Sequence, residues 1–140
     1  MGKMKVFLDT NVVVDFCAER KPFYEKAAAI FEMAHQKKTT LVVSSLTIVN
    51  MAYVIRKVMP RELVMRKIKK LIQSCQIASI DKETVLSAVT SCATDFEDAV
   101  QHFSALQAGA DLIITRDSNG FKDFRLPVMS PSQFIDRCTE

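Results

Sequence analysis

Acidic side chains follow two of the apolar runs in this sequence, at the points where buried strands are expected to end. Asp9 comes directly after the run Lys5–Leu8, and Asp117 follows the run Leu112–Thr115. A third acidic segment, Asp95–Asp98, opens the helical pattern that precedes the second of these runs. In a parallel sheet the carboxyl ends of the strands meet at one edge, where ligands bind. Carboxylate oxygens gathered there are the ligands that Mg²⁺ and Mn²⁺ prefer, and such a metal activates water and stabilises a phosphoryl transition state.

Each of these acids also has a purely structural interpretation. Thr94 and Glu97 have the spacing of a capping box, and Asp95 would suit the positive end of a helix dipole. Asp98 lies further into the helix, where capping explains it less well. Asp117 begins an Asp-Ser-Asn-Gly sequence that is typical of a turn. The functional interpretation therefore depends on the joint placement, because like charges at one edge repel and a cation is the simplest reason to tolerate them.

Strand-like and helix-like segments alternate along the chain. Short apolar runs predict buried strands at residues 5–8, 40–44, 77–80 and 112–115, with 127–129 as a candidate fifth strand. Apolar residues at helical spacing predict helices at 46–58, 61–74, 82–92 and 96–108, besides one that begins at Pro22 and a short one at Pro131. Strands that alternate with helices form βαβ units. We therefore expect a three-layer α/β sandwich, with a mostly parallel sheet of four or five strands flanked by helices.

The chain of 140 residues has the size and composition of one globular domain, placed at residues 1–140, and disordered or collagen-like classes are excluded. Its net charge of +3 permits a nucleic-acid partner without requiring one. The cysteines at positions 17, 75, 92 and 138 form no CxxC motif and no signal segment is evident, so a reducing cytoplasm is the expected compartment. The longest stretch without a charged residue, Thr39–Ile55, is shorter than the ~20 apolar residues that span a bilayer, so no membrane partner is expected.

Segments spread over the whole chain resemble the PIN domain family. They are Val6–Asn11 (VFLDTN), Val42–Ile48 (VVSSLTI), Asp95–Gln101 (DFEDAVQ) and Gly109–Asp117 (GADLIITRD), in the order and at the spacing of that family. The chain is most similar to bacterial members related to VapC toxins. This resemblance implies a metal-dependent endoribonuclease that hydrolyses RNA phosphodiesters, with an acidic cluster that binds Mg²⁺ or Mn²⁺.

The resemblance also implies roles for individual residues of this chain. Asp9, Asp98 and Asp117 match the acids that bind the metal and carry catalysis. Asp95 is a further candidate metal ligand, because it lies three residues before Asp98 and thus on nearly the same helix face. The polar residues expected to support the site are Asn11, Ser45, Asn50 and Thr115.

At Asn50 the chain departs from the family pattern, since many PIN domains carry a glutamate at the matching position. An asparagine offers a carbonyl oxygen to a metal but no charge. Two functions therefore stay open: an active ribonuclease, and a catalytically degenerate PIN-fold module that binds RNA or regulates. Phosphatases of the haloacid dehalogenase type are disfavoured, because they need a second Asp two residues after the first and Asn11 stands there.

Basic and apolar segments indicate where partners would bind. The candidates for contact with an RNA backbone are Arg56, Lys57, Arg61 and Arg116. VapC-like toxins pair with a small antitoxin protein, and the resemblance extends this expectation to the present chain. The predicted helix at 46–58 is apolar nearly all round, so it is a candidate surface for the antitoxin or for a second copy of the chain in a homodimer.

Overall fold

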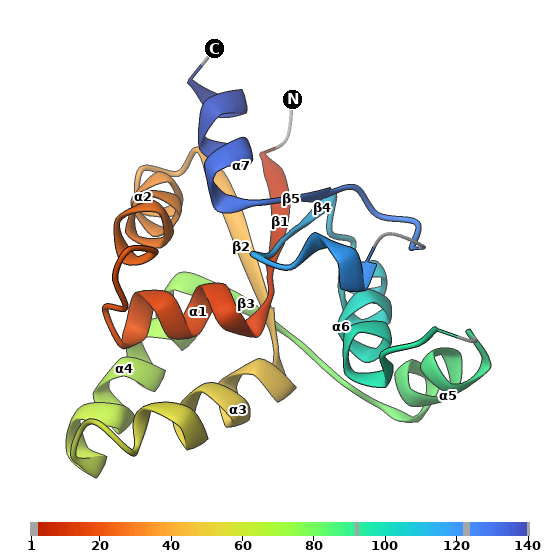
Figure 1. The fold of residues 1–140 in the computed structure, drawn as a ribbon, viewed down its shortest axis with the longest axis horizontal. Coiled ribbons are helices and arrows are strands. Elements are labelled where there is room, and N and C mark those ends of the chain that lie inside the picture. The colour runs from red at the N-terminus through yellow and green to blue at the C-terminus, as the bar shows by residue number, and fades with distance from the viewer. Residues whose placement is uncertain (1–2, 92, 122–123, 140) are drawn as a thin grey trace.

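The computed structural model describes residues 3–91, 93–121 and 124–139, which form a sheet with helices on both faces (Figure 1). The elements in chain order are β1 (Met4–Leu8), α1 (Thr10–Cys17), α2 (Tyr24–His35), β2 (Thr39–Ser44), α3 (Ser45–Ile55), α4 (Arg61–Ser74), β3 (Cys75–Ala78), α5 (Lys82–Thr90), α6 (Phe96–Gln107), β4 (Leu112–Ile114), the short 3₁₀ helix η1 (Ser118–Phe121), β5 (Val128–Met129) and α7 (Pro131–Cys138). This alternation confirms the predicted α/β class.

The strands are all parallel and lie in the order β3-β2-β1-β4-β5. β1 is central, with Phe7 paired to Val42 of β2 on one side and to Ile113 of β4 on the other. The chain moves outward from β1 through β2 to β3 and then crosses back to β4. The connections after β1 and β4 therefore diverge at their carboxyl ends, and such a switch point is where open α/β sheets bind ligands.

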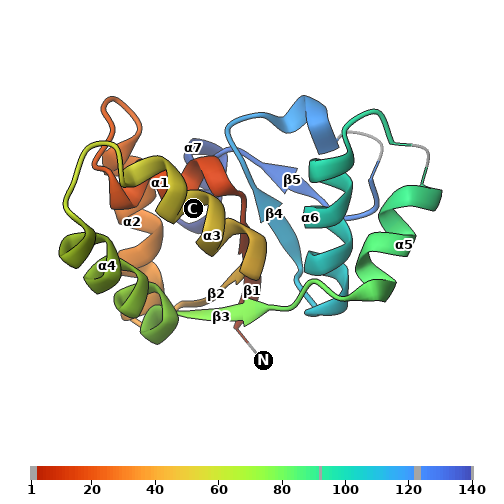
Figure 2. The ribbon, with the colours of Figure 1, turned by 90° about the horizontal axis from the view of Figure 1, so that it is seen from below.

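Alternating side chains of the strands build a separate core on each face of the sheet. Val6 and Leu8 pack with apolar residues of α1, α2, α3, α4 and α7. Phe7, which points the other way, packs with Ala105 of α6 and with Phe121. Figure 2 shows the resulting layers, with α1 to α4 on one side of the sheet and α5 and α6 on the other.

Helix α1 is not predicted by the sequence pattern. Its segment Val12–Val14 is β-branched, and such residues favour strands. The helix forms nevertheless, because Asp9 caps it by accepting a hydrogen bond from the Thr10 backbone N and because the valines and Cys17 are buried in the core. Burial against neighbouring helices thus outweighs local propensity here.

Several element ends differ from the predicted ones. β3 covers Cys75–Ala78 and not 77–80, because it pairs in register with residues 41–44 of β2. α3 ends at Ile55, before the predicted end at 58, and α5 ends at Thr90. Cys92, where a helix end was predicted, lies outside the described residues. Within the described ranges, no helix is both long and apolar enough to cross a membrane.

Candidate active site

Asp9 lies at the carboxyl end of the central strand and is held from several sides. Only 8% of its surface is exposed. Its Oδ1 atom accepts a hydrogen bond from the backbone N of Thr10 at 2.9 Å, and its Oδ2 atom accepts one from the hydroxyl of Thr115 at 2.8 Å. Burial is the main cause of a raised pKa at Asp9; the negative charge of Asp117 adds to it, and the hydrogen bonds oppose it. A cation beside Asp9 would remove the cost of burying this charge.

Buried polar side chains surround Asp9, and Gln101 of α6 is their centre. The Gln101 amide donates hydrogen bonds to Thr47 Oγ1 at 2.8 Å, to Thr10 Oγ1 at 3.2 Å and to Asp9 Oδ1 at 3.4 Å. Its carbonyl oxygen accepts a hydrogen bond from the Ser44 hydroxyl at 2.5 Å. Gln101 is fully buried, so these contacts tie α1, α3 and α6 to one another at the edge of the sheet.

The sequence pattern gives no role to Gln101, and of the two serines at the end of the second strand it assigns Ser45, not Ser44, to the site. Gln101 follows Asp98 by three positions in α6, so the two share a helix face, and this spacing is the signal that identifies it. Ser44 ends β2 and caps α3, where its hydroxyl accepts a hydrogen bond from the backbone N of Thr47 at 3.1 Å. Ser45, the residue predicted to support the site, is the half-buried first residue of α3.

The segment after β4 is tied to the segment after β1 through Asn11 and Thr115. The Asn11 amide donates to Thr115 Oγ1 at 3.2 Å and to Asp9 Oδ2 at 3.4 Å. Its carbonyl oxygen accepts from the backbone N of Arg116 at 3.3 Å. Thr115 Oγ1 also accepts from the backbone N of Asp117 at 3.1 Å. The structure therefore brings Asp9, Asn11, Thr115 and the exposed Asp117 to the same edge.

Helix α6 begins with acidic residues that have different surroundings. Asp95 caps the helix in place of the predicted Thr94, and its Oδ1 accepts from the backbone N of Asp98 at 3.0 Å. The Asp98 carboxylate lies against Gly120 of η1, where a Cβ would overlap it. Burial is the largest of the causes that raise the pKa of Asp98 to about 7, followed by the charges of Asp95, Asp9, Asp117 and Glu97.

Glu97, the remaining acid in this turn, contacts α3. The half-buried Asn50 donates a hydrogen bond from its side-chain amide to Glu97 Oε1 at 3.3 Å. Asn50 therefore faces a carboxylate of α6. The sequence pattern assigned Glu97 to a capping box, so this contact between the two helices was not predicted.

The chemistry of the donor set fits Mg²⁺ or Mn²⁺. Asp9, Asp98 and Asp117 offer only oxygen atoms. Burial is the largest cause of the raised pKa of Asp9 and of Asp98, and the negative charge of nearby acids adds to it, so a cation beside them would offset both effects. In the described part of the chain, no group of three or more His, Cys, Asp or Glu side chains is already arranged to hold a metal ion. Binding would therefore require side-chain movement, for which the exposed Asp117 has room.

Arg116, a predicted RNA contact, is engaged within the protein. Its guanidinium donates to the buried Asp15 through Nε to Oδ2 at 2.7 Å and through Nη2 to Oδ1 at 3.3 Å. It also lies 3.8 Å from the ring centroid of Phe23, while Arg20 contacts Asp15 Oδ1 at 2.8 Å. Sequence reasoning missed Asp15 because its only signal is its place on the buried side of α1, which the pattern does not reveal.

The other predicted RNA contacts lie around the connection between α3 and α4, at the end of α3 far from Asp9 (Figure 1). Arg56 and Lys57 stack on the exposed Tyr53, with their charged groups 4.0 and 5.4 Å from its ring centroid. Arg61 is the exposed first residue of α4. The structure thus does not place these three basic residues at the acidic edge.

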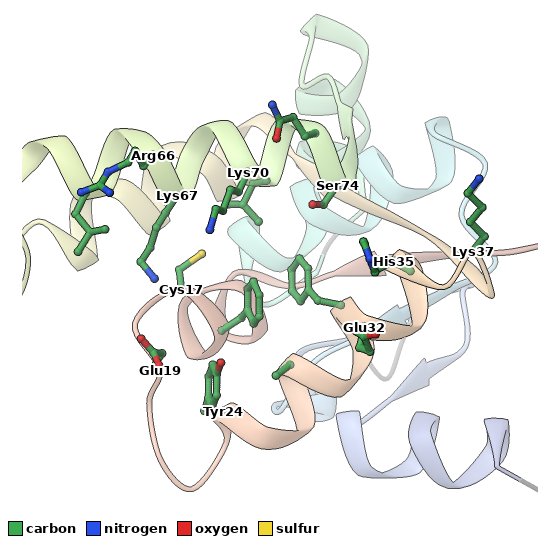
Figure 3. Close-up of a pocket in the computed structure, with 17 residues that line it drawn as sticks. Cys17, Glu19, Tyr24, Glu32, His35, Lys37, Arg66, Lys67, Lys70 and Ser74 are labelled. Carbon is green, nitrogen blue, oxygen red and sulfur yellow. The ribbon is translucent and has the colours of Figure 1, made fainter.

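A groove of about 940 Å³ lies between α1, α2 and α4 (Figure 3). Its wall is aromatic: the rings of Phe16 and Phe31 stack with centroids 3.9 Å apart, and Tyr24 stacks on Phe16 at 6.2 Å. Lys67 and Lys70 of α4 point toward this wall, as Figure 3 shows. The described residues that line the groove include none of the predicted metal ligands.

Comparison with known proteins gives relatives along nearly the whole chain. It is 27% identical over 142 aligned residues to Ribonuclease VapC1 of Aquifex aeolicus (strain VF5), covering 98% of this chain and 97% of the relative. A toxin-antitoxin complex from Klebsiella pneumoniae has a TM-score of 0.68 at 18% identity, with 90% of this chain and 97% of that chain covered. Mycobacterium tuberculosis VapC20, a sarcin-ricin loop cleaving toxin, has a TM-score of 0.63 at 11% identity, with 82% and 92% covered. These structures share the fold, and a family model for the PIN domain matches residues 5–119. The chain therefore belongs to the PIN domain family.

Proposed function

We propose that this protein is a Mg²⁺- or Mn²⁺-dependent endoribonuclease of the VapC type and the toxin of a toxin–antitoxin pair. The observation that carries the proposal is that Asp9, Asp98 and Asp117 lie at the switch point of the sheet, where burial first, and neighbouring acids after it, raise the pKa of Asp9 and of Asp98. Membership of the PIN domain family supports it, as does the whole-chain likeness to a relative named as a ribonuclease.

In this proposal Asp9, Asp98 and Asp117 hold the cation. When bound, the cation acts as a Lewis acid: it lowers the pKa of water and neutralises the charge that develops on a phosphate. The protein contributes orientation: Thr115 and Asn11 fix one oxygen of Asp9. Thr10 and Gln101 fix the other. Hydrogen-bonded carboxylates of this kind lose little further freedom when a cation or a phosphate arrives.

RNA cleavage tests this function. We would incubate labelled single-stranded and structured RNAs with the wild type and with Asp9→Asn, in Mn²⁺, in Mg²⁺ and in EDTA. We expect cleavage only by the wild type and only with metal. Asp136→Asn is the matched control, because Asp136 is an exposed acid of α7 outside the acidic edge. Cleavage in EDTA, or by Asp9→Asn at the wild-type rate, contradicts the proposal.

An antitoxin is the protein partner that we propose. Structural neighbours include the Klebsiella pneumoniae toxin-antitoxin complex and VapBC2 from Rickettsia felis bound to a promoter DNA fragment. The groove between α1, α2 and α4 suits an acidic amphipathic segment, whose apolar side chains would cover Phe16 and Phe31. Its carboxylates would pair with Lys67 and Lys70 (Figure 3).

Charge reversal tests the proposed antitoxin groove. We expect Lys67→Glu/Lys70→Glu to weaken binding of the protein encoded beside this gene by at least about tenfold, while RNA cleavage stays unchanged. Lys26→Glu/Lys38→Glu carries the same charge change on exposed residues that do not line the groove. Equal affinity for both double variants would show that the partner binds elsewhere.

A homodimer is the second assembly that we propose, with α3 as its surface. Val49 and Tyr53 are 65% and 55% exposed and lie one helical turn apart on the same face. Exposed apolar residues that form a stripe favour a protein contact. Sedimentation of the wild type and of Val49→Asp tests this, since we expect a dimer for the first and a monomer for the second.

A further inference from the structure

Helices α3 and α6 face each other through two successive pairs of polar side chains. The first pair is Thr47 and Gln101, hydrogen bonded at 2.8 Å. The second pair is Asn50 and Glu97, hydrogen bonded at 3.3 Å. Asn50 follows Thr47 by three residues in α3, which places it one turn further along. Glu97 precedes Gln101 by four residues in α6 and shares its face. Because Gln101 also contacts Asp9 at 3.4 Å, the second pair lies one helical turn from the residue that anchors Asp9.

From this arrangement we infer that Glu97 is a further metal-binding carboxylate of the site and that Asn50 is its positioning residue. The inference rests on the proposed function, since it adds one ligand to the cation site formed by Asp9, Asp98 and Asp117. The sequence pattern favours Asp95 as the additional metal ligand, whereas we assign that role to Glu97.

The surroundings of the acids in α6 distinguish these two candidates. Asp95 has a structural task, because its Oδ1 accepts the capping hydrogen bond from the backbone N of Asp98 at 3.0 Å. A capping bond of this kind stabilises a helix by roughly 1 kcal/mol, so turning Asp95 toward a cation has a cost. Glu97 instead extends its carboxylate across the interface to α3. Its carboxylate thus lies beside the turn of α3 that follows Thr47, whose partner Gln101 contacts Asp9.

An amide at position 50 suits the positioning role. The Asn50 side chain donates a hydrogen bond to Glu97 and carries no charge, so it holds the carboxylate without adding to the repulsion at this edge. A glutamate at position 50 would instead face Glu97 with a like charge. The carboxylate that many PIN domains carry on this helix is thus supplied from α6 in this chain.

Metal affinity measured by calorimetry tests the inference apart from enzyme activity. We expect Glu97→Gln to weaken Mn²⁺ binding by at least about tenfold. Glu83→Gln is the matched control, because Glu83 is an exposed glutamate in the first turn of the neighbouring helix α5, and we expect wild-type affinity for it. Thermal unfolding without metal verifies that both variants are folded.

The exchange variant Asn50→Glu/Glu97→Gln tests the positioning role. It reverses the donor and the acceptor of the pair and keeps one carboxylate, so we expect it to recover most of the Mn²⁺ affinity that Glu97→Gln loses. If the exchange variant binds no better than Glu97→Gln, the role of Asn50 is wrong. If Glu97→Gln binds like the wild type while Asp98→Asn has lost binding, the role of Glu97 is wrong and the proposed function stands. If Asp98→Asn also binds like the wild type, the proposed function itself fails.

Discussion

The carboxylate of Asp98 packs directly against Gly120, so closely that any side chain at position 120 would overlap it. This contact joins the first turn of α6 to the 3₁₀ turn that follows Asp117. It therefore fixes the approach of two acids that come from different segments of the chain. The 3₁₀ turn after β4 therefore connects two elements and also limits the positions that the Asp98 carboxylate can take.

Replacing Gly120 by alanine should displace Asp98. The added Cβ would overlap Asp98 Oδ2, the far end of a side chain that can turn, so we expect the carboxylate to move away while the fold is kept. We expect Mn²⁺ affinity to fall by about tenfold and RNA cleavage to fall with it. Ser118→Ala, a change at an exposed residue of the same turn, should preserve both. Calorimetry on the two variants measures the Mn²⁺ affinity. Wild-type affinity in Gly120→Ala would show that Gly120 does not position Asp98.

Metal-free protein should lose stability as the pH rises through the titration of Asp98. The pKa of Asp98 is raised from 3.8 to about 7, mainly by burial, so the folded state holds this proton more tightly than the unfolded state does. Folding is therefore favoured by protonation, and the contribution of Asp98 declines between about pH 4 and pH 7. We expect Asp98→Asn in EDTA to be more stable than the wild type at pH 8 and equal to it below pH 4. Urea unfolding across this range measures the difference, and a constant difference would contradict the assignment.

His102 should give the opposite dependence on pH. Its pKa is lowered from 6.5 to about 4, first by burial and then by the charge of Arg125, so the folded state disfavours the protonated imidazole. Stability from this group is complete above about pH 6.5 and is lost as the pH falls toward 4. The neutral ring accepts hydrogen bonds at Nε2 from the backbone N of Arg125 and of Leu126.

The variant His102→Gln separates this titration from the others. Glutamine keeps a hydrogen-bond acceptor but has no proton to gain, so the decline in unfolding free energy between pH 6.5 and 4 should be shallower than in the wild type. Urea unfolding at several pH values measures both slopes. Parallel curves for the two proteins would show that His102 does not titrate in this window.

Arg116 should act by holding the segment that carries Asp117. Its guanidinium is fixed by Asp15 at 2.7 Å and by the ring of Phe23, and its backbone N is fixed by Asn11. We expect Arg116→Ala to reduce RNA cleavage by at least about tenfold with little change in KM, whereas loss of a phosphate contact would raise KM. Arg20→Ala is the control, because Arg20 binds the same Asp15 carboxylate but lies outside the segment of Asp117. Similar cleavage by both variants would contradict this role.

Much of the fold follows from patterns that are local in the sequence. Apolar runs that end in Asp9 and near Asp117 mark buried strands, and the alternation with helices requires a parallel sheet whose strand ends share one edge. Helix α1 cannot be predicted from such local patterns. Its segment Val12–Val14 has the composition of a strand and becomes helical only through burial and the cap at Asp9.

The contacts inside the candidate site were harder to predict, because they join residues far apart in the sequence. The spacing from Asp98 places Gln101 on the same face of α6, but it does not reveal that Thr47 and Asp9 are its partners. Nothing local to Asn50 indicates that it faces Glu97. Such pairings depend on how α3 and α6 pack. The sequence therefore locates the acidic edge, whereas the structure identifies which side chains orient its acids.

The most direct test of the account is to measure Mn²⁺ binding and RNA cleavage on the same samples. Mn²⁺ would be titrated by calorimetry into the wild type, Asp98→Asn and Asp136→Asn, and the cleavage rate of one labelled RNA would be followed over the same range of concentrations. We expect cleavage to rise with metal occupancy in the wild type and in Asp136→Asn, and we expect Asp98→Asn to lose both metal binding and cleavage. Cleavage that persists in Asp98→Asn, or that does not follow the occupancy of the site, would contradict it.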